Sequence, residues 1–416
     1  MNSASFVVIE TQLSNFGLKP LKASSRLGFY TVLVSRDPDR YRGLTTARGV
    51  FQHHVDEIIV TNSNDLEETS RALDELDARH PIRGIMTVTD YQLGIVAELA
   101  RSRGLPGLDP HAAETCRNKL RMRDKCQALN ISPKYAHARN LDDALTAARQ
   151  WGYPVVAKPM TDSASIGVEL CRTQDDLVGA FAHLSEGTTN FRGQSKPPGA
   201  LIEEYALGPE VSVEVIFHEG RHVVLGVTDK NLGPHPYFIE VGDTFPSILP
   251  QSLIEDIEDV SLRALRTVGH NFGSAHVEVR VTPDGPKVIE INGRIPGDEI
   301  TRMVEHVTGV DMLEATVSLH AGLEATVEPV PQGAVASRYL LAHGTGTLTR
   351  ISGSDLATQV EGCLEVDFEV SVGDSVDAPT NNLDYIGHVL CSGSTPGLAS
   401  RRADTAVGQV TFDIDS

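Results

Sequence analysis

The sequence predicts a protein of mixed α/β and α+β class with three parts. Over the first hundred residues, short β-branched runs alternate with helical stretches, which is typical of a parallel sheet with helices on both faces. A strand-rich centre follows, and the tail after Glu328 has short strands separated by glycine turns. We therefore expect a parallel-sheet domain over 1–110, a central domain over 111–325 and a small β-rich C-terminal module over 326–416.

The alternation in the first part predicts four strands and three helices. The expected strands are Phe6–Ile9, Tyr30–Val34, Ile58–Val60 and Gly84–Val88, and the expected helices are Leu18–Leu27, Leu66–Leu76 and Leu93–Arg101. Glycine and proline then interrupt the pattern at Gly104-Leu105-Pro106-Gly107 and at Asp109-Pro110, which indicates the end of this domain.

The centre begins with two predicted helices. One helix is expected from Pro110 to about Leu129, and a second covers Leu141–Trp151 before Gly152 ends it. The strands expected after them are 155–158, 200–204, 211–217, 223–227, 275–281 and 288–291, separated by Gly, Pro and Asp turns. This spacing favours an antiparallel sheet.

Composition excludes several classes of protein. The 416 residues are 40% hydrophobic and 22% charged, as in an ordinary globular protein. A formal net charge of -20 disfavours nucleic-acid binding, because the chain would repel a phosphate backbone. The five scattered cysteines include no C-x-x-C pair, which fits a reducing cytoplasm. The apolar run Phe6–Ile9 is too short for an export signal, and no apolar run is long enough to cross a membrane.

Polar residues recur with a period of two around a turn at Pro283-Asp284-Gly285. His276, Glu278 and Arg280 share one face of the strand before it, and Glu290, Asn292 and Arg294 share one face of the strand after it. Two carboxylates and an amide oxygen can then converge, and such hard oxygen ligands suit Mg²⁺. The alternative is that these are solvent-facing residues of an ordinary antiparallel sheet.

Two further segments carry polar groups that need partners. Lys158 ends a strand and precedes a loop of small and hydroxyl residues, Asp162 to Val168, so it could face phosphate oxygens; the alternative is an edge lysine beside an ordinary turn. Glu203 to Ala206 could read an adenine edge and Glu210 could accept hydrogen bonds from a ribose, or the two could form a hairpin with an acidic tip.

Taken in order, these segments resemble the ATP-grasp superfamily. The segments are Tyr-Pro-Val-Val-Ala-Lys158, a small-residue loop, Ile-Glu203-Glu-Tyr, Gly208-Pro-Glu210, Val-Glu278-Val and Ile-Glu290-Ile-Asn292-Gly-Arg294. The resemblance covers about 110 to 320, and the preceding domain is similar to a pre-ATP-grasp domain. It implies a central ATP-grasp domain with a mobile lid over about 132–206.

The resemblance also implies a role for each matching residue. Lys119 and Lys158 would contact ATP phosphates, with the loop of Ser163, Ser165 and Gly167 closing over them, although Ser-Ala-Ser-Ile-Gly replaces the family's usual glycine-rich form. Glu203, Glu204, Tyr205 and Ala206 would form the adenine hinge, and Glu210 would hold the ribose. The implied metal ligands are Glu278, Glu290 and Asn292, for Mg²⁺ with Mn²⁺ as a substitute, and Arg294 would hold the acyl phosphate.

Within the superfamily the chain resembles the L-amino-acid ligases of the bacilysin-synthetase type. Such an enzyme uses ATP to activate a carboxylate as an acyl phosphate, which an amine then attacks. The catalytic candidates are Arg294, Lys158 and His276, although His276 could equally be a core histidine. Lys230, Glu240 and Gly297 are candidates for the substrate pocket.

Two other functions stay open at this point. An ATP-grasp enzyme that uses formate or bicarbonate, as in purine biosynthesis, would keep every nucleotide residue and differ in the acceptor pocket. A nucleotide-binding module without catalysis has little need of the metal ligands and Arg294 together. As partners we expect small molecules rather than nucleic acid or a membrane, and a homodimer is the default among soluble oligomers.

Overall fold

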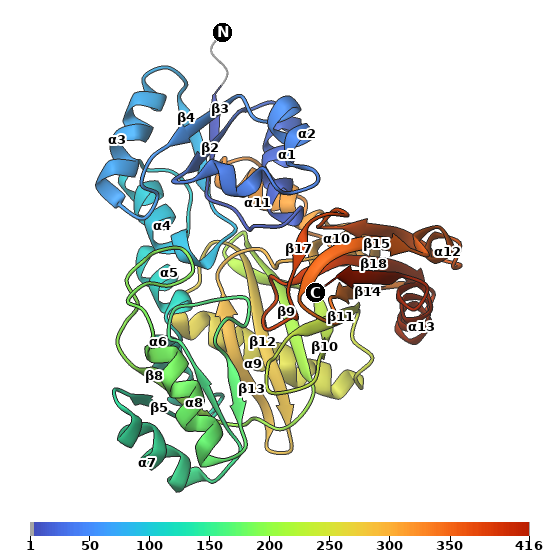
Figure 1. Ribbon diagram of the computed structural model, residues 1–416. Coiled ribbons are helices and arrows are strands. Elements are labelled where there is room, and N and C mark those ends of the chain that lie inside the picture. The colour runs from blue at the N-terminus through green and yellow to red at the C-terminus, as the bar shows by residue number, and fades with distance from the viewer. Residues whose placement is uncertain (1–3, 416) are drawn as a thin grey trace.

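The computed structural model describes residues 4–415 and begins with a parallel sheet (Figure 1). Its strand order is β3 (Glu57–Val60), β2 (Tyr30–Ser35), β1 (Ser5–Ile9) and β4 (Ile82–Met86). The helices of this region are α1 (Lys19–Arg26), α2 (Ala47–His53), α3 (Leu66–Asp77) and α4 (Leu93–Ser102). Along β1, Phe6 and Val8 enter one hydrophobic core while Val7 and Ile9 enter another. Both faces of the sheet are therefore buried, and the predicted α/β class is confirmed.

The helix predicted from Pro110 to Leu129 is wrong as a single element. Asn118 has an extended backbone (φ -93°, ψ 105°) and divides it into α5 (Pro110–Arg117) and α6 (Lys119–Gln127). The Asn118 side chain accepts hydrogen bonds from the backbone N–H groups of Leu120 and Arg121 and so caps α6. The break places Lys119 at the first position of α6.

A small antiparallel sheet occupies the segment predicted as the lid, about 132–206, and is called the lid below. Its order is β5 (Tyr135–Ala138), β8 (Ala200–Glu204), β6 (Val155–Lys158) and β7 (Glu169–Cys171). The helices α7 (Leu141–Trp151) and α8 (Gln174–Ser185) share one hydrophobic core with this sheet. The strands predicted at β6 and β8 are confirmed.

A large antiparallel sheet of eight strands forms the centre. Its order is β13 (Gly285–Asn292), β12 (Gly273–Thr282), β9 (Glu210–His218), β10 (Arg221–Leu232), β11 (Glu240–Phe245), β14 (Ala334–Leu341), β18 (Tyr385–Gly393) and β16 (Cys363–Phe368). Because β14 pairs with β11, the C-terminal strands continue the central sheet. Helix α9 (Gln251–Val268) packs in a core with strands β9, β10, β12 and β13. Helices α10 (Ile300–Thr308) and α11 (Met312–His320) pack in a second core, which includes residues of β11 and β14.

The remaining C-terminal elements are β-rich, as the sequence predicted. The strands β17 (Ser375–Val376), β15 (Gly346–Ser352) and β19 (Thr411–Asp415) form a three-stranded sheet, accompanied by α12 (Ser354–Thr358) and α13 (Pro396–Val407). Among residues 4–415, none of the helices is both long and apolar enough to cross a membrane.

The lid is fastened to the N-terminal domain by a buried arginine. Arg192, in the loop before β8, is 5% exposed, and its Nη2 donates a hydrogen bond to the Thr11 carbonyl at 2.5 Å. Its Nη1 lies 3.5 Å from the carboxylate of Glu10, which is 2% exposed. The Arg192 carbonyl in turn accepts hydrogen bonds from Arg36 and Asn64. A lid that swung away would leave Glu10 buried without this cation.

Replacing Arg192 by Met should therefore loosen the lid. Removing one partner of a buried ion pair costs about 3–5 kcal/mol, because the other charge stays desolvated. We expect faster backbone hydrogen exchange across 132–206 in R192M than in the wild type. The control is R139M, which removes an exposed arginine from the same lid. Equal exchange in R192M and R139M would contradict this role for Arg192.

Candidate active site

The predicted site residues meet at one cavity of about 370 Å³. It is bounded by the lid, by strands β9, β10, β12 and β13 of the central sheet and by the loops that follow β1 and β4. The predicted residues that line it are Lys119, Lys158, Ser163, Ser165, Glu203, Glu204, Tyr205, Ala206, Glu210, Lys230, Glu240, His276, Glu278, Glu290, Asn292, Arg294 and Gly297. Gly167 is not among the lining residues: a Cβ there would meet Leu184 and Pro159 instead.

Two buried lysines reach the cavity from different elements. Lys119 is 4% exposed, and its Nζ donates hydrogen bonds to the Asp162 carbonyl at 2.7 Å and to Glu290 at 2.9 Å. Lys158 is 3% exposed and lies at the end of β6, an interior strand of the lid sheet, so it is not an edge lysine. The two cations give the cavity a positive side that suits phosphate oxygens.

Glu203 is occupied by cations rather than free to meet an adenine. Its carboxylate lies 2.8 Å from Lys158 Nζ and accepts two hydrogen bonds from Arg123, at 2.6 and 3.1 Å. Burial favours the neutral acid, but Arg123 and Lys158 outweigh it and lower the pKa of Glu203. Burial lowers the pKa of Lys158 to about 8, although Glu203 opposes that shift. The Glu203 side chain therefore positions Lys158, which leaves the backbone of 204–206 for contact with a base.

Strand register explains the surroundings of Glu210. On β9 it lies opposite Lys230 of β10 and opposite Arg280 of β12. Arg280 Nε donates a hydrogen bond to Glu210 at 2.9 Å, and its guanidinium lies 5.4 Å from the ring centre of Tyr205. Burial raises the pKa of Glu210, and Lys230 and Arg280 oppose that shift. The hydrogen bond from Arg280 fixes the carboxylate beside the predicted adenine hinge, where a ribose would need a hydrogen-bond acceptor.

The loop over the cavity is held by hydrogen bonds to backbone carbonyl groups. Ala164 and Ser165 have positive φ values of 56° and 57°, and Ser165 Oγ donates a hydrogen bond to the Phe238 carbonyl at 2.9 Å. The Asn382 N–H, from the C-terminal part of the chain, donates to the Ala164 carbonyl at 3.0 Å. Lid, centre and C-terminal part therefore meet at this loop.

The polar faces of β12 and β13 converge as their spacing predicted. Glu278 and Glu290 are directly opposite each other, and so are His276 and Asn292. His276 and Asn292 are each only 4% exposed, so these residues form a cavity wall rather than a solvated face.

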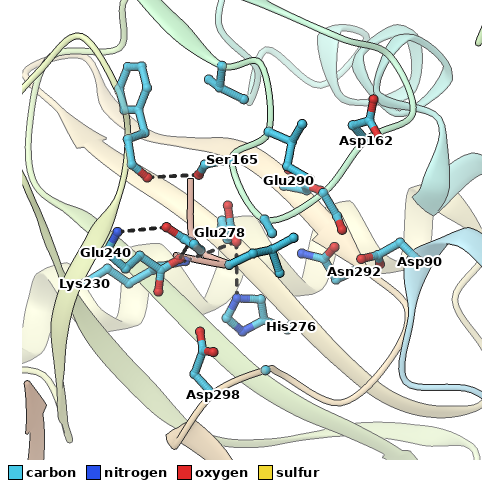
Figure 2. A pocket seen from close by; sticks show the side chains of 18 of the residues that line it. Asp90, Asp162, Ser165, Lys230, Glu240, His276, Glu278, Glu290, Asn292 and Asp298 are labelled. Atoms are coloured by element: carbon cyan, nitrogen blue, oxygen red, sulfur yellow. Dashed lines mark hydrogen bonds and ion pairs between the residues drawn. The ribbon is translucent and has the colours of Figure 1, made fainter. Parts of the chain in front are cut away.

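Lys230 joins three carboxylates at this wall. Its Nζ lies 2.7 Å from Glu240, 3.1 Å from Glu278 and 3.9 Å from Glu210. Figure 2 shows the amine of Lys230 between Glu240 and Glu278. Burial lowers the pKa of Lys230, but the carboxylates raise it well above its ordinary value, so the amine stays charged.

His276 is bound on both ring nitrogens by carboxylates. Nδ1 lies 2.9 Å from Glu214, which is fully buried, and Nε2 lies 3.3 Å from Glu278. Burial opposes the charged ring, yet Glu214 and Glu278 together raise the pKa of His276 to about 10. The residue is thus both a paired core histidine and a lining residue that orients Glu278.

Arg294 reaches across to the N-terminal domain. Its Nε and Nη2 donate to the two oxygens of Asp90 at 2.9 and 2.6 Å. The Asn292 amide lies between Asp90 and Glu290: in one orientation its nitrogen donates to them at 3.1 and 3.3 Å, and in the other its oxygen faces both carboxylates. In the second orientation Asn292, Asp90 and Glu290 all present oxygen atoms to the same point. A hard cation such as Mg²⁺ favours oxygen ligands of this kind.

Several residues that line the cavity were not predicted from the sequence. They are Asp90, Arg192, Asp298, Tyr339 and Tyr385. Arg123, which does not line the cavity but pairs with Glu203, was missed as well. Arg123 is fully buried on α6, yet arginine in a helix ordinarily signals an exposed face. Asp90 is 204 residues from its partner Arg294, so no local pattern could have joined them.

Comparison with known proteins gives three family matches in chain order. An ATP-grasp N-terminal domain matches residues 21–107, an ATP-grasp domain matches 151–302, and the L-amino acid ligase C-terminal domain 2 matches 338–415. The N-terminal and central parts of the chain thus match ATP-grasp domains, and the resemblance to the ATP-grasp superfamily noted in the sequence is confirmed. The domain matched by the C-terminal part of the chain is described as a domain of L-amino acid ligases.

Individual relatives and solved structures are similar to this chain over most of its length. The uncharacterized protein y4rH of Sinorhizobium fredii is 28% identical over 98% of this chain and 82% of its own length. Carnosine synthase 1 of Gallus gallus is 27% identical over 79% of this chain, which spans only 37% of that protein. The crystal structure of an L-amino acid ligase from Bacillus licheniformis has a TM-score of 0.84 at 20% identity, with full coverage of both chains, and so shares the fold.

His276 gives a pH prediction. Its folded pKa of about 10 lies above the ordinary 6.5, so the charged ring stabilises the fold fully below 6.5 and this contribution is lost as pH rises through about 10. Glu214→Gln should lower the pKa by removing one of the two carboxylates. NMR titration of the ring protons measures both values, with Glu324→Gln on the surface as the matched control. An unchanged pKa in E214Q would contradict the role of Glu214.

Proposed function

We propose that this chain is an ATP-dependent carboxylate–amine ligase that forms an amide bond through an acyl phosphate. It joins amino acids, or an amino acid and a related carboxylate, and releases ADP and phosphate. The observation that carries the proposal is that one cavity holds two buried lysines, an oxygen-rich strand pair and Arg294. The names of the relatives, carnosine synthase 1 and L-amino acid ligase, support amide-bond formation as the reaction class.

In this proposal the chain acts mainly by positioning and by neutralising charge. Lys119 and Lys158 bind the ATP phosphates while Glu203 keeps Lys158 in place. The carboxylate substrate attacks the γ-phosphorus and becomes an acyl phosphate, which Arg294 holds. Closure of the lid keeps water away from this intermediate, which would otherwise hydrolyse before the amine arrives.

Glu278, Glu290 and Asn292 would hold Mg²⁺, since carboxylate and amide oxygens are the ligands it prefers. When bound there with ATP, the ion offsets negative charge on the phosphate oxygens. Asp90 is a further oxygen donor close to Asn292. The homodimer and the cytoplasmic location stay predictions.

The direct test is ADP release with MgATP and single L-amino acids, then pairs, with and without hydroxylamine to trap an acyl phosphate. We expect ADP release with particular pairs, accompanied by a product with the mass of the joined substrates. Turnover with formate or bicarbonate alone would favour the purine-type reaction instead. Tight ATP binding without turnover for any carboxylate would favour a binding module.

Replacing Arg294 by Met tests its role. Removal of one donor that stabilises an oxyanion typically lowers turnover about 10²–10³-fold. We expect that loss in kcat for R294M, with a much smaller change in the dissociation constant of ATP measured by calorimetry. Equal losses of turnover and nucleotide binding would contradict the assignment, because they would place Arg294 at the nucleotide.

A further inference from the structure

Asp298 differs from the other acidic residues of the cavity wall. Asp90, Glu210, Glu240, Glu278 and Glu290 each pair with an arginine or a lysine. Within residues 4–415, the Asp298 carboxylate has neither a hydrogen bond nor an ion pair. Figure 2 shows it on the loop after β13, below His276 and pointing into the cavity.

The position of Asp298 has no evident structural purpose. It precedes α10, but the start of that helix has no side-chain cap. Its backbone is left-handed (φ 53°), a conformation that asparagine adopts as readily as aspartate. The carboxylate is therefore not needed for the turn or for the helix.

The groups that face Asp298 are mostly acidic or phenolic. They are Glu240 and Asp243 of β11, Lys230 of β10, Glu299 at the start of α10, Tyr339 of β14 and Tyr385 of β18. Burial first, and then Glu240 and Asp243, raise the pKa of Asp298 well above its ordinary value. A carboxylate in such surroundings binds a proton, or a cation, more readily than one in water.

The C-terminal part of the chain completes this end of the cavity. The rings of Tyr339 and Tyr385 stack with centres 4.4 Å apart, and both side chains line the cavity. The hydroxyl of Tyr385 has no hydrogen-bond partner among the described residues, whereas that of Tyr339 donates to Asp243 at 2.7 Å. Aromatic rings, an open hydroxyl and an unpaired carboxylate together suit a primary ammonium group, which offers three N–H donors.

We propose that Asp298 binds the ammonium group of the amine substrate and accepts the proton that this group must lose before it attacks. The inference rests on the proposed ligase function. Asp298 is four residues after Arg294, on the same loop, and both side chains line the same cavity, so the proton acceptor and the residue that would hold the acyl phosphate serve one site.

Proton transfer from the ammonium group precedes formation of the amide bond. A proton passes from the ammonium to Asp298, and the free amine attacks the acyl carbon to form a C–N bond. The bond from that carbon to the phosphate oxygen breaks, and the phosphate leaves with the electron pair. The amide nitrogen loses its second proton to the departing phosphate, and Asp298 returns its own proton to solvent.

The experiment compares two nucleophiles in wild type and Asp298→Asn. Amino acid amines are mostly protonated at neutral pH and need a proton acceptor, whereas hydroxylamine is mostly unprotonated and does not. We expect amide formation to fall about 10²-fold in D298N, the usual size of a general-base contribution. Hydroxamate formation should fall much less, so the ratio of amide to hydroxamate is the readout.

A pH series and a control variant complete the test. The amide deficit of D298N should shrink as pH rises, because more of the amine is already free. Asp284→Asn, in the exposed turn between β12 and β13, should leave the ratio unchanged. Equal losses with both nucleophiles at every pH would overturn the proposal and mark Asp298 as structural. Absence of ADP release from the wild type with every carboxylate would instead overturn the ligase function itself.

Discussion

The cavity depends on the pairing of buried charges. Glu210, Glu240 and Glu278 would repel one another in a protein interior, and Lys230 is the cation that all three share. A buried charge without a partner costs several kcal/mol. Loss of this one amine would therefore remove a shared cation from carboxylates on three strands at once. The same logic applies to Arg123 at Glu203 and to Arg294 at Asp90. The cavity is lined by ion pairs that also hold its walls together.

The sequence could predict the parts of this site that follow local periodicity. Glu278, Glu290 and Asn292 alternate along two strands joined by a short turn, so their convergence follows from the geometry of a hairpin. The ordered motifs then identified the superfamily, which no single motif could do. Alternating strands and helices likewise sufficed for the N-terminal sheet.

Other parts depend on contacts between distant segments. Asp90 meets Arg294 and Arg192 meets Glu10 only after separate domains have packed. The break at Asn118 was hidden because an asparagine within a helical pattern is not a strong stop signal, although here it caps the second helix. Asp298 lies in an irregular loop, where neither the period of a helix nor that of a strand applies.

The shared sheet has a consequence for how this chain could have diversified. Strand β14 covers the edge of β11, so removing the C-terminal part would leave β11 as the edge of a shorter sheet, with a row of unpaired N–H and C=O groups. Exposed edges of that kind promote aggregation. Exchange of the whole C-terminal part between relatives would require a matching β11, whereas single changes at Tyr339 or Tyr385 leave the strand pairing intact. Point mutation can therefore alter this wall of the cavity under fewer structural constraints than recombination of the whole C-terminal part.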